Sequence, residues 1–91
     1  MDRFEWDEEK AKRNLLKHGL DFEAVRRFEF DAAINWLADR NTYGEERIIA
    51  VSALGDNIYT LIYTIRGEAI RVISLRRASQ KEMSIYARSR E

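Results

Sequence analysis

The stretch that decides the fold runs from Ile70 to Tyr86 and reads IRVISLRRASQKEMSIY. Its first half alternates side chains with the period of two that is typical of a β-strand. Its second half opens at residues 79–82 with SQKE, a capping-box pattern that predicts the first turn of a helix. The stretch therefore predicts a strand that passes directly into a C-terminal helix, with Arg76 and Arg77 at the corner.

Three strand-like runs predict an antiparallel sheet, because the turns between them are short. The runs cover residues 47–54, 58–65 and 69–76. If the second turn centres on residues 67 and 68, Arg76 shares a face with Tyr59, and Leu75 shares the opposite face with Thr60. A slip of one residue exchanges these partners, so the face of each arginine depends on the register.

Two short helices are predicted before the sheet. The first runs from about residue 8 to residue 17, with Asp7 as its N-cap and Gly19 as its terminator. Its predicted inner side carries Ala11, Leu15 and His18. The second begins after Asp21 and ends near residues 28–30.

The remaining segments complete the predicted order. Residues 4–6 suit a short strand or an extended lead-in, residues 33–36 suit a strand, and residues 39–46 form a polar loop. The fold class is therefore α+β, with two short N-terminal helices, a three- to four-stranded antiparallel sheet and one C-terminal helix.

Composition excludes several classes of protein. The 91 residues suit one compact domain over residues 1–91, and no apolar run is long enough for a membrane span. The absence of cysteine and of a signal-peptide pattern predicts a cytoplasmic protein. The net charge is zero, but residues 1–46 hold 8 basic against 12 acidic side chains, and residues 47–91 hold 8 against 4. This balance argues against bulk coating of nucleic acid and allows a local phosphate-binding surface.

Arg76 and Arg77 are the first candidates for function, because the guanidinium group is well shaped for phosphate. Adjacent residues of a strand point to opposite faces. We therefore expect one arginine to bind phosphate and the other to pair with a carboxylate such as Glu46 or Glu82. Two surface arginines at a sheet edge are the simpler alternative.

Other candidates each have a structural alternative. His18 is the only histidine and suits a general acid or base, or else a cation at a helix C-terminus. Arg47 stands where a loop meets a strand, a common place for functional groups, or pairs with a neighbouring glutamate. Tyr63 and Tyr86 present a hydroxyl or stack on a base, or are core residues. One histidine and no cysteine argue against a metal site.

The chain as a whole resembles the BrnT family. The N-terminal matches are residues 4–7 (FEWD), Lys10, Asn14, residues 17–19 (KHG) and residues 22–24 (FEA). The later matches are residues 44–47 (GEER), 63–64 (YT), 66–67 (RG), 71–74 (RVIS), 76–78 (RRA), Glu82 and Tyr86. The sequence departs from the family pattern at Glu8, where proline is frequent, and at Leu75, where alanine is frequent.

The resemblance implies a toxin of a bacterial type II toxin–antitoxin system with a fold similar to RelE-type ribonucleases. The implied activity is cleavage of RNA without metal or other cofactor. The implied partner is an antitoxin with a ribbon-helix-helix type domain, through which alone the toxin reaches operator DNA. A dimer within the toxin–antitoxin complex is one implied arrangement.

Joining this resemblance to the residues gives a hypothesis for the site. The candidate catalytic residues are His18, Arg47, Arg76, Arg77, Glu82 and Tyr86, and the candidate RNA-binding residues are Lys17, Tyr63 and Arg71. The 2′-hydroxyl of RNA would attack the adjacent phosphate, with arginine stabilising the developing charge. The alternative is a non-catalytic protein-binding module that docks a DNA-binding partner.

Overall fold

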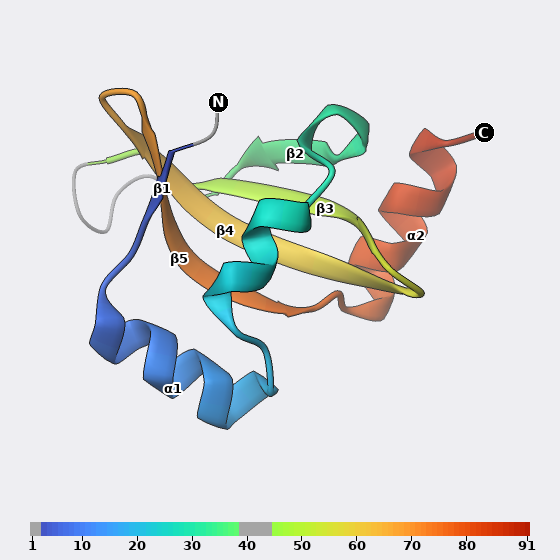
Figure 1. Cartoon of the computed structure of the whole chain (residues 1–91). Coiled ribbons are helices and arrows are strands. Elements are labelled where there is room, and N and C mark those ends of the chain that lie inside the picture. Colours follow the sequence, from blue (N-terminus) through green and yellow to red (C-terminus); the bar gives the residue numbers. More distant parts are fainter. Residues whose placement is uncertain (1–2, 39–44) are drawn as a thin grey trace.

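A computed structural model of the chain describes residues 3–38 and 45–91. Five strands form one sheet, with helices packed against it (Figure 1). The strands are β1 (Phe4–Glu5), β2 (Ile34–Leu37), β3 (Ile48–Leu54), β4 (Asn57–Arg66) and β5 (Ala69–Arg77). The helices are α1 (Glu8–His18), α2 (Gln80–Ser89) and the 3-10 helices η1 (Phe22–Arg27) and η2 (Phe30–Ala32). The predicted α+β class is confirmed.

The sheet has one strand more than the predicted three to four. The spatial order is β1-β5-β4-β3-β2, and β2 to β5 pair antiparallel as predicted. The added strand, β1, pairs in parallel with β5, with Phe4 opposite Ile70. It is short because the chain turns into α1 directly after Asp7. The polar loop predicted at residues 39–46 lies mostly outside the described residues.

Capping groups set the helix ends where the sequence predicts them. The Asp7 carboxylate accepts hydrogen bonds from two backbone N–H groups of the first turn of α1, and Gly19 ends this helix at φ 71°. Helix α2 begins with a complete capping box between Ser79 and Glu82. The second predicted helix begins after Asp21 as expected, but it is the 3-10 helix η1.

The two faces of the sheet carry different elements. The core lies on the face covered by η1, where Phe22 and Val25 pack with Leu61 and Leu75 of the sheet. Alternate residues of β4 point the other way, and there Thr60 contacts α2 through its hydroxyl group. Helix α2 lies at the end of the sheet where β3 turns into β4 (Figure 1). The two faces of the sheet are therefore met by different helical elements.

Helix α1 is anchored to the sheet by an amide group. Nδ2 of Asn14 donates to the carbonyl oxygens of Leu75 (2.8 Å) and Leu20 (3.1 Å), and its Oδ1 accepts from the N–H of Leu75 (3.2 Å). These bonds take the place of a neighbouring strand at the edge of β5, beyond the end of β1. Asn14 is accordingly buried, which is unusual for an unpaired polar side chain but expected for one with three partners.

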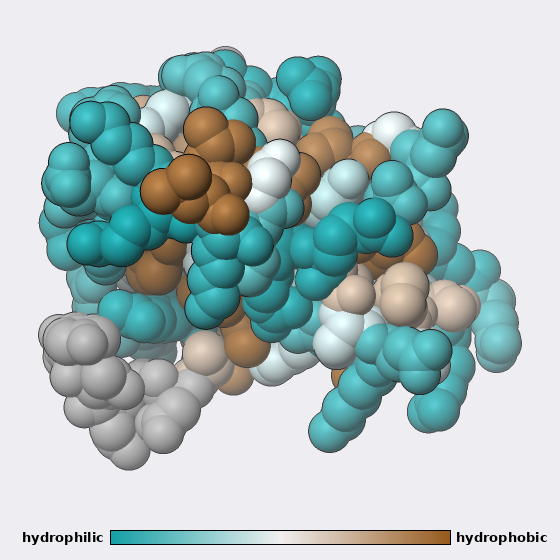
Figure 2. All heavy atoms as spheres, turned by 90° about the horizontal axis from the view of Figure 1, so that it is seen from below, coloured by the Kyte–Doolittle hydropathy of each residue, from teal (hydrophilic) through white to brown (hydrophobic). Residues whose placement is uncertain are grey.

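The predicted inner side of α1 is partly wrong. Leu15 is 48% exposed and Leu16 is 87% exposed, because the side of the helix that meets β5 is centred on Asn14. Seen from below, apolar side chains gather on α1 and are surrounded by hydrophilic residues (Figure 2). Within the described residues, no helix has the length and apolar character needed to cross a membrane.

A β-bulge in β5 changes the predicted register. Near the turn the prediction holds, since Tyr63 pairs with Val72. The next pair joins Ile62 to Ser74, so Ile73 is an extra residue without a partner in β4. Beyond it, Thr60 pairs with Arg76 instead of with Leu75. The predicted faces of Leu75 and Arg76 are therefore exchanged.

We expect Asn14→Ala to lower the free energy of unfolding by about 3 kcal/mol, because it leaves the buried N–H and carbonyl groups of Leu75 without partners. Urea unfolding of the wild type and the variant measures this difference. The control is Lys12→Ala, a change at an exposed position of the same helix, with an expected effect below about 0.5 kcal/mol. An equally small effect of Asn14→Ala would contradict the anchoring role.

Candidate active site

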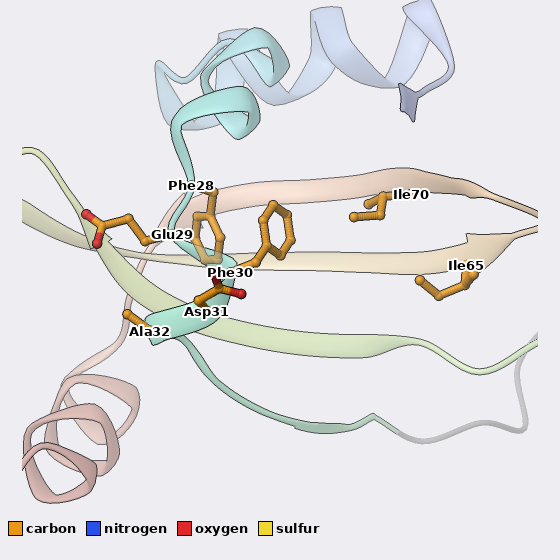
Figure 3. A pocket seen from close by; sticks show the side chains of 7 residues that line it. All are labelled: Phe28, Glu29, Phe30, Asp31, Ala32, Ile65 and Ile70. Carbon is orange, nitrogen blue, oxygen red and sulfur yellow. The ribbon is translucent and has the colours of Figure 1, made fainter. Parts of the chain in front are cut away.

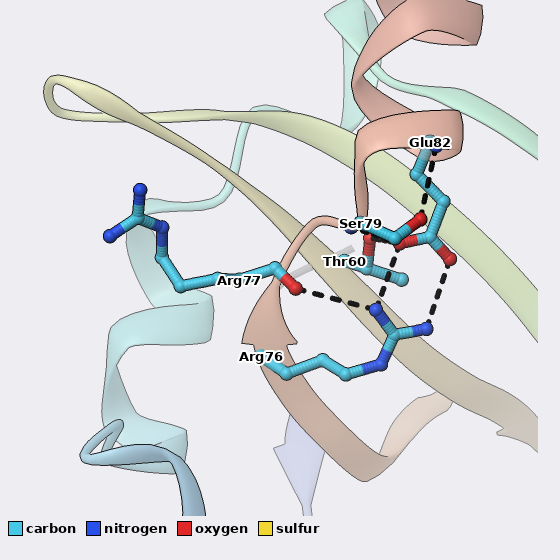
Figure 4. A network of polar contacts seen from close by, with 5 residues as sticks. All are labelled: Thr60, Arg76, Arg77, Ser79 and Glu82. Carbon is cyan, nitrogen blue, oxygen red and sulfur yellow. Dashed lines mark hydrogen bonds and ion pairs between the residues drawn. The ribbon is translucent and has the colours of Figure 1, made fainter.

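The corner between β5 and α2 is held by a two-pronged ion pair. Nη1 and Nη2 of Arg76 donate to Oε1 and Oε2 of Glu82 at 2.8 and 2.9 Å. Glu82 also accepts from the hydroxyl of Thr60 (2.9 Å) and from the N–H of Ser79 (2.8 Å). Figure 4 shows these groups converging on the carboxylate from the sheet and from the start of the helix. Arg76 therefore joins α2 to the sheet.

This network makes Glu82 a poor base. The hydrogen bonds from Arg76 lower the pKa of Glu82 to about 2, and those from Ser79 and Thr60 act in the same direction against the effect of burial. The pair correspondingly raises the pKa of Arg76. A carboxylate with four donors and so low a pKa has little tendency to take a proton from a hydroxyl group.

Arg77 points away from Arg76 (Figure 4). It belongs to the opposite face of β5, where it pairs with Tyr59 of β4, and its guanidinium carbon lies 5.9 Å from the centre of the Tyr59 ring. Arg77 is exposed, and within the described residues no carboxylate forms a salt bridge with it. Of the two arginines at the corner, Arg77 is the one whose guanidinium is open to a ligand.

Lys17 and His18 lie beside the same strand. A groove of about 310 Å³ runs between α1 and the edge of β5. Helix α1 lines it with Lys10, Arg13, Asn14, Lys17 and His18, and β5 lines it with Ile73 and Ser74. Arg77 follows Ser74 by three residues, about 10 Å along the strand. The structure therefore places His18 at the edge of the strand whose end carries the arginine pair.

Arg47 and Arg71 lie toward the other end of the sheet. Arg71 pairs with Glu5 of β1 at 3.4 Å, and it precedes Arg77 by six residues, about 20 Å along β5. Arg47 precedes β3, whose first residue Ile48 is opposite Tyr63 of β4. Both predicted residues are therefore well separated from the corner.

The two tyrosines of the hypothesis are buried. Tyr63 belongs to the core cluster and meets Phe30 edge-on at 5.9 Å between ring centres. Burial raises its pKa. Tyr86 of α2 is 7% exposed, and the guanidinium of Arg90 lies 5.4 Å from its ring centre. Their rings offer little surface for stacking on a base.

A cavity near the β4–β5 hairpin is acidic at its rim. It measures about 490 Å³ and lies between η2 and the β4–β5 hairpin. Figure 3 shows Phe28, Phe30, Ile65 and Ile70 around it, together with the carboxylates of Glu29 and Asp31. These charges disfavour a polyanion. Within the described part of the chain, no group of three or more His, Asp or Glu side chains is placed to hold a metal ion.

Comparisons with known proteins agree on one family. A family model described as the ribonuclease toxin BrnT of a type II toxin–antitoxin system matches residues 6–82. The crystal structure of the Brucella abortus ribonuclease toxin BrnT is similar, with a TM-score of 0.72 and 33% sequence identity over 88% of this chain and 100% of that chain. The comparison with curated proteins gives no match. The chain belongs to the BrnT family.

Membership of the BrnT family confirms the function implied by the resemblance. The chain is a ribonuclease toxin of a type II toxin–antitoxin system, and its partner is an antitoxin. This favours an enzyme over the binding-module alternative.

The sequence analysis did not select Lys10 and Arg13 as site residues, although both are cations that line the groove. Arg13 precedes Lys17 by four residues and Lys10 precedes it by seven, and this spacing is the signal that places all three on one side of a helix.

We expect Glu82→Gln to lower the free energy of unfolding at pH 7 by about 2 kcal/mol, because it removes the charge that Arg76 pairs with. The folded-state pKa of Glu82 is lowered from 4.5 to about 2. The stabilisation is therefore complete above pH 4.5 and is lost as the pH falls toward 2. Urea unfolding at several pH values should show the two proteins converging over this range.

The matched control is Glu23→Gln, which removes an exposed ion pair with Arg26. Its effect should stay below about 0.5 kcal/mol and change little with pH, since exposed pairs contribute little. A Glu82→Gln difference that persists unchanged at pH 2 would rule out the ion pair as its source.

Proposed function

We propose that this chain cleaves RNA without a metal ion, at the end of β5 that carries Arg77. The observation that carries the proposal is the division of the arginine pair. Arg76 is held by Glu82, whereas Arg77 is exposed on the strand that lines the groove of His18. A guanidinium and an imidazole are the two groups that phosphodiester cleavage by an internal nucleophile needs, and here one strand carries the first and borders the groove of the second.

The proposed reaction uses the 2′-hydroxyl group of the substrate as the nucleophile. His18 accepts the proton of this hydroxyl as its oxygen bonds to the adjacent phosphorus. Arg77 donates hydrogen bonds to the phosphoryl oxygens, whose negative charge grows in the transition state. The bond to the 5′-oxygen breaks, and that oxygen takes a proton from water. The products are a 2′,3′-cyclic phosphate and a 5′-hydroxyl end.

Burial and electrostatics support His18 over the other candidate bases. Glu82 has a pKa of about 2 because of its pair with Arg76, and Tyr86 is buried in α2. His18 is half-exposed at the groove. Lys17 belongs to the proposed RNA-binding surface with it. RNA that contacts Arg47 or Arg71 would do so away from the reacting phosphate. Contact of RNA with Tyr63 would require movement of the core.

The proposal also covers the domain type of the antitoxin, its contact with DNA and the assembly of the complex. We propose a ribbon-helix-helix type domain in the antitoxin, contact with operator DNA through that domain alone, and a dimeric arrangement of the complex. A cytoplasmic location fits the proposed RNA substrate. Co-expression of the chain with the product of the neighbouring gene, followed by co-purification and operator binding, tests these points together. An operator complex formed by the toxin alone would contradict them.

We expect Arg77→Ala to lower the rate of RNA cleavage in EDTA by about 10²–10³-fold, because it removes a donor to the transition state. His18→Gln should lower the rate by about 10²–10⁴-fold through loss of the base. Both residues are at least partly exposed, so the unfolding free energy of each variant should stay close to that of the wild type. Cleavage of a labelled RNA, followed by identification of its ends, measures both effects.

The control is Arg88→Ala, which removes an exposed cation from the last turn of α2. The cleavage rate of this variant should remain within about twofold of the wild-type rate, since Arg88 belongs neither to the proposed catalytic residues nor to the proposed RNA-binding residues. Full activity of Arg77→Ala and His18→Gln would contradict the proposed centre. Loss of wild-type activity in EDTA that Mg²⁺ restores would contradict the metal-free reaction.

A further inference from the structure

The groove between α1 and β5 carries a row of cations along one side. Lys10, Arg13 and Lys17 stand three and then four residues apart, so they project from one side of the helix at intervals of about 4.5 and 6 Å along its axis. All three are exposed. His18, which closes the row, follows Lys17 at the last residue of α1.

In the described part of the chain, the cations of this row are not held in salt bridges, although the nearby carboxylate of Asp7 interacts electrostatically with Lys10. Within residues 3–38 and 45–91, none of Lys10, Arg13 and Lys17 forms a salt bridge. The one lysine of α1 that does is Lys12, whose ammonium group lies 3.9 Å from the carboxylate of Glu9. The side of α1 that lines the groove therefore presents positive charge toward β5.

The β5 side of the groove is open because the strand has no strand partner there. β1 ends opposite Arg71, and farther along this edge the amide of Asn14 bonds to the backbone of Leu75. Between them stand Val72, which is buried, Ile73, the extra residue of the bulge, and Ser74, and the last two line the groove. The bulge thus places an apolar side chain and a hydroxyl group opposite the row of cations.

We propose that this groove binds the sugar–phosphate backbone of single-stranded RNA and leads it to the end of β5. A row of cations suits a ligand that carries one charge on every unit. Ile73 offers an apolar contact and Ser74 a hydrogen bond beside that row. The inference rests on the proposed function, because it assigns the path by which substrate reaches His18 and Arg77.

The test measures binding separately from cleavage. The probe is a short fluorescent 2′-O-methyl RNA, which lacks the free 2′-hydroxyl and cannot be cut by the proposed reaction. Its affinity is measured by anisotropy over a range of salt concentrations. One variant carries Lys10→Gln, Arg13→Gln and Lys17→Gln. The matched control loses three exposed cations elsewhere, through Lys12→Gln, Lys81→Gln and Arg88→Gln.

We expect the slope of log affinity against log salt to become shallower by about 2 in the groove variant, since each lost phosphate contact removes about 0.7 for a single strand. The control should keep the wild-type slope. An equal change in both variants would show that total charge alone matters and would overturn the proposal. An unchanged slope in the groove variant would also overturn the proposal, because it would show that these three cations do not contact the RNA phosphates.

Cleavage of unmodified RNA by the same proteins separates the two proposals. An unchanged binding slope together with wild-type cleavage by the groove variant overturns the groove assignment and leaves the ribonuclease centre standing. Failure of the wild type to cleave RNA overturns the proposed function, and the groove assignment with it.

Discussion

The bulge at Ile73 decides what each arginine at the corner can do. Without this extra residue, β5 would continue in the register of its first pairs, and Arg76 would lie opposite Tyr59. The shift by one residue places Arg76 beside Thr60, on the face where α2 packs, and turns Arg77 to the other face. One inserted residue thus separates a structural arginine from an exposed one. Bulges are common beside functional sites for this reason.

The pair formed by Arg76 and Glu82 explains why the carboxylate at the start of α2 does not pair with the exposed arginine Arg77. The one carboxylate at the start of α2 is fully engaged, by two bonds from Arg76 and by those from Ser79 and Thr60. Its charge is therefore balanced on the α2 face of the sheet. Because Arg77 projects to the opposite face, its positive charge is not offset by Glu82. The same interactions that fix the helix also preserve an electropositive site at the end of β5.

Local sequence signals predict most of this fold, but they fail where contacts between residues distant in the sequence determine the structure. Asp7, Gly19 and Ser79 act within a few residues, so the ends of α1 and α2 follow from the sequence. The inner side of α1 does not, because Asn14 gains its burial from Leu75, which lies 61 residues away. The bulge has no local signal either, since it depends on which residues of β4 stand opposite. The division of roles within the arginine pair depends on that bulge and so could not be read from the strand pattern.

Charge totals for halves of the sequence are a poor guide to where this chain binds an anion. Residues 1–46 are net acidic, yet they supply the cations of the groove. In α1 the acids stand in the first turn, where they favour the helix N-terminus, and Glu9 pairs with Lys12 outside the groove. Helical periodicity thus sorts opposite charges onto different sides of one element. A polyanion at the β5 edge meets the cationic side, whereas the cavity beside η2 presents Glu29 and Asp31. The surface potential near each site, and not the net charge of the segment, selects the ligand.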